Sequence, residues 1–156
     1  MLRISKITDY GTLVMARIAA QPERHFSAAE LAEGLGLGLP TVSKVLKTLA
    51  RHGLVNGLRG AHGGYALARP AHTITVAEII DALEEQPFGL TECSASAGVC
   101  EREQDCRIRI NWLSINTVVR RALEDVSLAD MAEPVPAARH VHPLHGPDDR
   151  SEQTVS

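Results

Sequence analysis

Residues 27–69 read SAAELAEGLGLGLPTVSKVLKTLARHGLVNGLRGAHGGYALAR, and this stretch decides the fold. It opens with the spacing of a capping box, in which the Ser27 hydroxyl can accept from the backbone of Glu30 while the Glu30 carboxylate reaches back to the backbone of Ser27. A capping box begins a helix, so the sequence predicts a short helix over residues 28–35.

The residues that follow predict a turn and a second helix. The sequence GLG at 36–38 favours a tight turn, and Pro40 suits the first position of a helix over residues 40–52. Gly53 then supplies a C-terminal stop. A short helix, a glycine turn and a second helix are typical of a helix-turn-helix, in which the second helix reads DNA.

The second helix has a row of hydrogen-bond donors on its outward face. Its apolar positions recur at helical spacing and turn inward, which leaves the polar side chains outside. Donors are what phosphate oxygens and many base edges need, although an ordinary solvated helix face is the alternative interpretation. The predicted DNA-contacting residues of this helix are Thr41, Ser43, Lys44, Lys47 and Arg51.

Two short strands are predicted over 54–58 and 64–67, joined by the glycine-rich, basic sequence RGAHG at 59–63. A hairpin directly after a recognition helix is a wing. Arg59 at its tip could enter a narrow minor groove, where the electrostatic potential is most negative, and His62 is a weaker predicted contact. The sequence therefore predicts a winged helix-turn-helix.

Charge is distributed unevenly along the chain, whose formal net charge is −3. Residues 1–69 contain nine lysines and arginines against four acidic residues, whereas residues 70–132 contain five against eleven. A basic N-terminal half on a mildly acidic protein indicates a surface that faces a polyanion, although many such asymmetries belong to solvated faces.

Further helices are predicted on both sides of this module. One covers residues 8–20 and has Asp9 in its first turn, and another over 76–85 begins at a second capping box. From about residue 105 an apolar heptad seam continues for about 20 residues. Its predicted interface residues are Ile108, Trp112, Ile115, Val119 and Ala122. A core helix within one subunit would show the same pattern, but so long a helix after a small domain favours dimerisation.

All three cysteines, Cys93, Cys100 and Cys106, lie in a loop of small, polar and charged residues that has almost nothing to bury. Zinc sites usually contain cysteines separated by two to four residues, and neither gap here fits that pattern. Iron–sulfur clusters are also held by thiolates, and long flexible gaps suit a larger group. Spacing favours a cluster, while zinc and directly redox-active thiols remain open.

We therefore expect a mainly α-helical chain with a small β-wing: a winged helix-turn-helix domain plus a long C-terminal dimerisation helix. The absence of a recognisable secretory signal, membrane-spanning run or enzyme motif predicts a cytoplasmic protein that is not an enzyme and has no small-molecule substrate. The predicted segments are a DNA-binding domain over 1–70, a connecting helix and turn over 71–91, a cysteine loop over 92–106, a dimerisation helix over 107–132 and a disordered tail over 133–156.

The ordered combination of motifs resembles the bacterial winged-helix regulators that bind iron–sulfur clusters, a group of cluster-assembly regulators and nitric-oxide-sensing repressors. Within this group, the sequences KITDYG, LPTVSKVLK, LTEC and SLADM are most similar to regulators of the SUF cluster-assembly operon. The resemblance covers about residues 1–131, through LRISKITDYG (2–11), AAELAEGLGLGLPTVSKVLKTLARHGLV (28–55), RGAHGGYALARP (59–70), the cysteine loop and Trp112.

The resemblance implies a homodimer that binds a double-stranded DNA operator and holds one cluster per cysteine loop. Cys93, Cys100 and Cys106 occupy the three cysteine positions of the group and would be ligands. Some members add a histidine three residues after the last cysteine, but Arg109 stands there and cannot ligate. Others use a carboxylate near the start of the partner subunit's first helix, and Asp9 matches that place.

The function that the resemblance implies is control of operator affinity by a [2Fe-2S] or [4Fe-4S] cluster, in a repressor of SUF genes. Such a cluster can be lost from an air-exposed preparation. One alternative is a nitric-oxide- or redox-sensing winged-helix repressor whose thiols respond directly, without a cluster. A more distant alternative is a cluster-bearing electron-transfer protein.

Overall fold

The structure is a computed structural model that describes residues 4–133, so the predicted tail from residue 134 onward lies outside the described residues. Its elements are α1 (Lys6–Ala19), α2 (Ala28–Leu35), α3 (Leu39–Arg51), β1 (Val55–Leu58), β2 (Gly64–Leu67), the 3-10 helix η1 (Ala71–Thr73), α4 (Val76–Leu83), α5 (Glu92–Ala95), α6 (Arg109–Glu124) and α7 (Leu128–Ala132).

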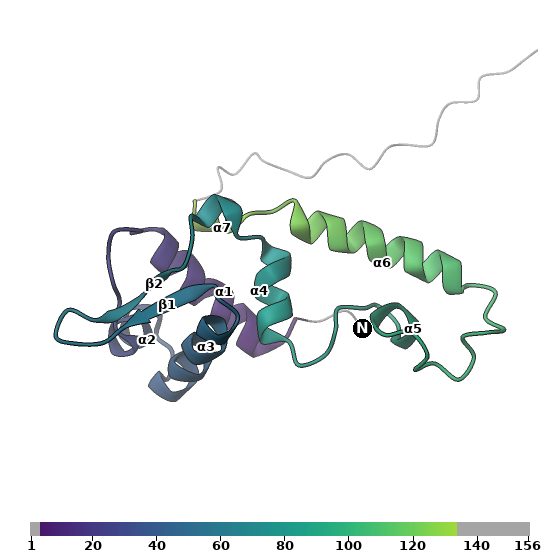
Figure 1. Ribbon diagram of the computed structural model, residues 1–156, viewed down its shortest axis with the longest axis horizontal. Helices are drawn as coiled ribbons and strands as arrows, with labels where there is room; N and C mark the ends of the chain where they lie inside the picture. Colours follow the sequence, from purple (N-terminus) through teal and green to yellow (C-terminus); the bar gives the residue numbers. More distant parts are fainter. Residues whose placement is uncertain (1–3, 134–156) are drawn as a thin grey trace, which may run out of the picture.

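Figure 1 shows an elongated arrangement with two different ends. At one end α1, α2 and α3 pack together and the β1–β2 hairpin projects from them; we call this the winged end. At the other end, α5 and the cysteine segment lie beneath the first turns of α6; we call this the cysteine end. α4 stands between the two and contacts α1, α3 and α6. No helix within residues 4–133 is both long enough and apolar enough to cross a bilayer.

Local signals set most helix starts as predicted. The amide of Glu30 donates to the Ser27 hydroxyl at 3.1 Å, and the amide of Ser27 donates to the Glu30 carboxylate at 2.8 Å, so the predicted capping box is confirmed. The second predicted box, between Thr75 and Glu78, is also present at the start of α4. α1 begins earlier than predicted because the Ser5 hydroxyl accepts from a backbone amide of its first turn.

The wing is a two-stranded antiparallel sheet with Leu58 opposite Gly64. Phe26, just before α2, pairs with it: the Phe26 amide donates to the Tyr65 carbonyl at 3.0 Å, and the Tyr65 amide donates back at 2.7 Å. Gly64 has φ of 146°, and a Cβ there would lie 2.8 Å from the Phe26 backbone. Glycine is therefore required where the wing joins the helices.

The hydrophobic core lies at the winged end. Its members come from α1, α2, α3, β1, α4, the residues beside these elements and, unexpectedly, α7. Burying one large apolar side chain stabilises a fold by roughly 1.5–3 kcal/mol, so this cluster is the main source of stability. The side chains with no solvent exposure include Val14, Met15, Ile18, Val42, Val45, Leu46, Leu49, Ile74, Ile79 and Leu128.

After α6 the chain returns to the winged end. The Val76 amide donates to the Val126 carbonyl at 2.9 Å, and the Leu128 amide donates to the Ile74 carbonyl at 2.7 Å. This main-chain pairing places the side chain of Leu128 in the core. The sequence predicts a short helical turn here, and α7 is found, but assigning these residues to the dimerisation helix was wrong because α7 packs with the core.

Candidate functional site

An open groove of about 860 Å³ separates the outward face of α3 from the wing. Four apolar side chains of α3 are fully buried, which fixes the opposite face of the helix toward solvent. Thr41, the fifth predicted contact of this helix, is half-buried near its start and does not line the groove. The predicted residues that do line it are Ser43, Lys44, Lys47 and Arg51, beside Gly57 and Tyr65 of the strands.

The cations of this face are not neutralised by the protein. Among residues 4–133, Lys44, Lys47 and Arg59 form no ion pair, and Arg51 donates only to the Thr48 hydroxyl, at 3.2 Å. The arginines that do form ion pairs lie elsewhere, at Arg24, Arg69, Arg109 and Arg120. A groove with several unpaired cations is what a phosphate backbone requires.

The wing tip extends the same positive surface. Arg59 and His62 are both exposed there, as predicted. The Gly63 amide donates to the Gly60 carbonyl at 3.0 Å, and a Cβ on Gly63 would lie 2.3 Å from a backbone oxygen. The tight turn therefore depends on glycine, and it leaves both basic side chains free to reach a nucleic-acid groove.

The cysteine segment is more structured than the sequence indicates. α5 occupies its first residues, and Cys93 is only 8% exposed, so the expectation that this loop buries almost nothing was wrong. The Cys93 Sγ lies 3.4 Å from the Thr91 hydroxyl, and at the start of α5 the Thr91 amide donates to the Ser94 hydroxyl at 2.9 Å. Short polar caps of this kind are difficult to anticipate in a glycine- and serine-containing stretch.

Cys100 and Cys106 are half-buried, and all three thiols are free. Cys100 lines a pocket of about 490 Å³, while Cys106 lines a separate one of about 360 Å³. Across residues 4–133, no three histidine, cysteine or acidic side chains converge as metal ligands. Three free thiols fit an iron–sulfur cluster in kind, but the loop would have to draw them together to bind one.

Glu103 and Arg109 connect the later part of the cysteine segment to α6. Glu103 accepts from the Gly98 amide at 2.5 Å and from the Arg109 guanidinium at 2.6 Å, and its side chain is only 13% exposed. The Nε of Arg109 is buried without a partner among the described residues. Arg109 thus ties the loop to the first turn of α6, a role that sequence spacing did not reveal.

Asp9 lies exposed in the first turn of α1, and its carboxylate makes no hydrogen bond or ion pair within residues 4–133. It belongs to no group of potential metal ligands among the described residues of its own chain. Its proposed contribution to a partner's site is untested by a single chain and stays a prediction.

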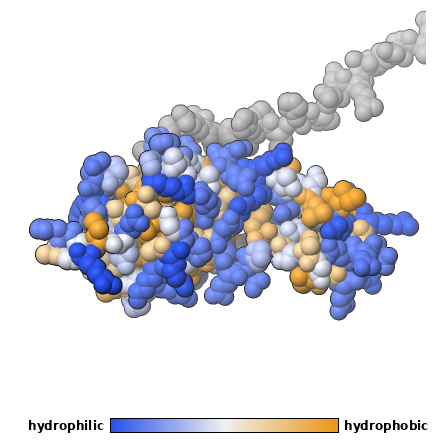
Figure 2. Space-filling view, in the orientation of Figure 1, coloured by the Kyte–Doolittle hydropathy of each residue, from blue (hydrophilic) through white to orange (hydrophobic). Residues whose placement is uncertain are grey.

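α6 has no buried residue. Of the predicted seam, Ile108, Ile115 and Ala122 are exposed, whereas Trp112 and Val119 are half-buried within their own chain. Ile110 and Val118, outside the predicted seam, are 75% and 64% exposed. Figure 2 shows hydrophobic side chains gathered over the N-terminal half of this helix. α6 therefore does expose apolar side chains, but not all of them lie at the positions of the predicted heptad.

Comparison with known proteins agrees with this architecture. The family Rrf2, described as iron-dependent transcriptional regulators, matches residues 4–134. Protein rrf2 of Nitratidesulfovibrio vulgaris is 30% identical over 131 residues, which cover 83% of this chain and 87% of that protein.

Two solved structures are also similar. CymR (YrzC), the global cysteine regulator of B. subtilis, has 30% identity and a TM-score of 0.68, covering 85% of this chain and 97% of that one. IscR of T. potens has 28% identity and a TM-score of 0.65, covering 90% and 93%. With a winged fold, an unpaired cationic groove and matches over most of its length, the chain belongs to the Rrf2 family of transcriptional regulators.

Proposed function

We propose that the protein is a repressor that contacts operator DNA through α3 and the wing. The unpaired cations that line one groove, Lys44, Lys47 and Arg51, are the observation that supports this most strongly. Outside the groove, Arg59 and His62 extend the contact to the wing tip. Donors on α3 would meet phosphates and base edges of the major groove, and the wing would reach the adjacent minor groove.

We further propose a homodimer formed through α6. A helix with no buried residue and several exposed isoleucine and valine side chains leaves apolar surface in water, and a second copy would cover it. Two-fold symmetry would present two α3 helices to successive DNA turns, which are about 34 Å apart.

For the sensor, we propose that Cys93, Cys100 and Cys106 hold an iron–sulfur cluster, with Asp9 of the partner subunit as the candidate fourth ligand. The three free thiols in one polar segment support this, as does the resemblance to cluster-binding regulators. When bound, the cluster supplies a group whose presence depends on iron and sulfide supply. Cys93 of α5 and Cys106 just before α6 would hold it, so that a bound cluster would link these two elements. On the same resemblance, the regulated genes would be those of SUF cluster assembly.

The test is an anaerobic purification followed by an absorption spectrum, an iron and sulfide assay, and a DNA-binding titration before and after exposure to air or nitric oxide. We expect a coloured protein whose DNA affinity changes as the colour is lost. The variants Cys93→Ala and Cys106→Ala should lose both the absorption and the response. If they kept the spectrum and the response of the parent protein, these thiols would not be the ligands.

A second candidate is direct thiol sensing. It is favoured by the separation of Cys100 and Cys106 into different pockets and by the likeness to a cysteine regulator, CymR of B. subtilis. A protein that stays colourless after reconstitution with iron and sulfide, yet loses DNA affinity when a thiol oxidant is added, would establish this function in place of the cluster.

A further inference from the structure

Arg120 of α6 makes an unusually complete set of contacts for a surface arginine. Its two terminal nitrogens donate to both carboxylate oxygens of Asp81 in α4, each at 2.6 Å, and its Nε donates to Glu124 at 2.9 Å. Its guanidinium carbon lies 5.9 Å from the centre of the Phe88 ring. Only 28% of the side chain is exposed. A planar, bidentate and ring-stacked arginine fixes orientation in a way that a lysine cannot.

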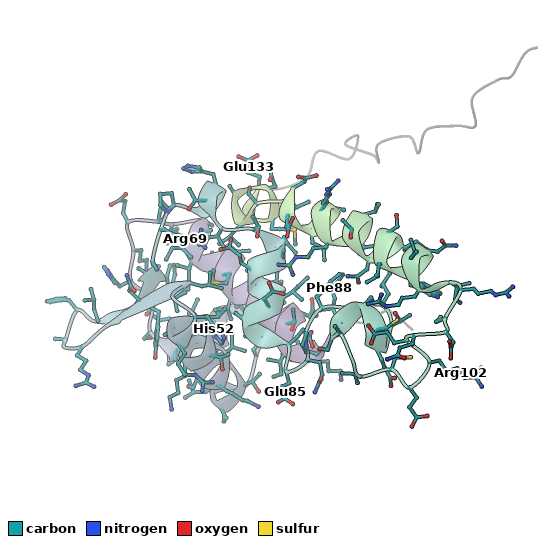
Figure 3. All side chains as sticks on the ribbon, turned by 45° about the vertical axis from the view of Figure 1, so that its right-hand side comes forward. His52, Arg69, Glu85, Phe88, Arg102 and Glu133 are labelled. Carbon is teal, nitrogen blue, oxygen red and sulfur yellow. The ribbon has the colours of Figure 1, made fainter. Side chains whose placement is uncertain are left out.

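This contact joins α6 to the segment that leads into the cysteines. Phe88 lies between α4 and α5, and Figure 3 labels it where the chain leaving α4 runs below α6. One turn before Arg120, the Asn116 side chain accepts from the Leu90 amide at 3.1 Å. Through Arg120 and Asn116, one face of α6 therefore contacts both α4 and the segment that follows it, and α6 itself begins at Arg109, three residues after Cys106.

The end of α4 and the residues directly after it face α3 across a pocket. A pocket of about 470 Å³ is lined by residues 82–86 on one side and, on the other, by Lys44, Thr48, Arg51 and His52 of α3. Lys44 and Arg51 also line the DNA groove. Nearby, Glu84 accepts from the Ser5 amide at 3.0 Å and from the Thr8 hydroxyl at 2.6 Å, which fixes the start of α1 against α4.

We propose that Arg120 is the positioning residue that transmits the state of the cysteine segment to α3, by clamping α6 to α4 through Asp81. A displacement of the first turn of α6 moves Arg120, Asp81 follows because the pair is bidentate, and residues 82–86 shift against the groove cations. This inference rests on the proposed sensor function and adds the route by which that sensor reaches DNA.

The guanidinium of the clamp stays protonated in the range where proteins fold. Hydrogen bonds to Asp81 hold the pKa of Arg120 above its ordinary value, against the opposing effect of partial burial, and the bond to Glu124 adds to the rise. The groups that face this guanidinium from α4 and α6 are both carboxylates, those of Asp81 and Glu124.

The experiment compares the DNA affinity of one protein in two sensor states. The probe is a fluorescein-labelled duplex selected from a random pool by binding to the parent protein, and the states are reconstituted with iron and sulfide and stripped with chelator. The ratio of the two dissociation constants measures coupling. We expect Arg120→Gln to keep DNA binding and cluster absorption but to reduce this ratio at least about fivefold toward one, within the usual range of allosteric coupling.

Two further variants separate coupling from folding. Asp81→Asn should reduce the ratio to the same extent, and the double variant should be no worse than either single one because both remove one interaction. Arg121→Gln is the matched control: it is an exposed neighbour on α6 that forms no ion pair within residues 4–133. It should leave the ratio unchanged.

If DNA binding shifts the cysteine segment through the clamp, adding the duplex should also change the rate at which iodoacetamide alkylates the thiols of the chelator-stripped parent, and not of Arg120→Gln. If DNA affinity changes between the two sensor states equally in the parent protein and in Arg120→Gln, the clamp would be overturned and the proposed function would stand. A parent protein with the same affinity in both states would overturn the proposed function, and the clamp with it.

Discussion

The winged end and the cysteine end of this molecule are built in opposite ways. The winged end has a core of side chains with no exposure, drawn from α1, α3, α4 and α7, so it is complete within one chain. The cysteine end has one buried cysteine, two half-buried ones and a long helix without a buried residue. Its order comes from polar contacts such as Glu103 with Arg109. This difference indicates that the winged end is stabilised mainly by its own core, whereas the cysteine end depends on polar contacts.

The largest expected effect would come from placing a charge where a second chain should cover α6. Val118→Glu should leave the monomer folded, because the side chain is 64% exposed, but on the proposed dimer it would bury an unpaired carboxylate. Such a burial costs about 3–5 kcal/mol, so we expect the protein to sediment as a monomer. The control is Val99→Glu, the same change at a valine that is 60% exposed outside α6. A dimeric Val118→Glu protein would contradict the proposed interface.

The next effect tests whether α7 belongs to the winged end. Leu128→Ala would open a cavity in the core, because Leu128 has no exposure, and should lower the free energy of unfolding by about 2–5 kcal/mol. Urea denaturation followed by circular dichroism measures this. Met131→Ala, on the same helix at 47% exposure, should change stability far less. Equal effects of the two changes would mean that α7 does not complete the core.

A smaller effect should appear in DNA binding alone. Lys47→Ala removes one unpaired cation from the groove and should weaken binding to every duplex tested, while the slope of log affinity against log salt decreases by about one. The melting temperature should not change because Lys47 is exposed. Arg102→Ala removes the same charge from the cysteine end and should leave the slope unaltered. An unchanged slope for Lys47→Ala would exclude a phosphate contact at this position.

The smallest effect concerns the junction between the two ends. Burial alone would raise the pKa of Glu84, but hydrogen bonds from the Thr8 hydroxyl and the Ser5 amide outweigh it and hold the pKa below the ordinary value of 4.5. A lowered carboxyl pKa stabilises the fold above pH 4.5, and this stabilisation is lost as pH falls through the folded-state pKa. Glu84→Gln should therefore reduce the dependence of melting temperature on pH below 4.5. Glu33→Gln, an exposed control on α2, should not.

Short-range patterns predicted much of the fold. The capping boxes, the GLG turn and the hairpin glycines involve residues a few positions apart, and each was found close to its predicted place. The outward face of α3 followed from the spacing of its apolar residues, so four of its five predicted contacts line the groove.

Contacts between distant residues could not be predicted in this way. Glu84 meets Thr8 across 76 positions, and Asp81 meets Arg120 across 39. No local pattern distinguishes these carboxylates from solvated ones. In the predicted seam of α6, Trp112 and Val119 are half-buried within their own chain, and the seam itself stays a prediction. The cysteine ligand set and the partner contribution of Asp9 stay predictions.

The return of the chain at Leu128 has a consequence for biosynthesis. The core of the winged end is incomplete until Leu128, about 50 residues beyond Ile74, has been synthesised. Translation of that stretch takes roughly 3–10 s. Closing so long a loop also has an entropic cost, and contacts of this range form late in folding. A nascent chain therefore completes its DNA-reading part only after its cysteines have left the ribosome. Every winged end with a complete core therefore already carries its cysteine segment.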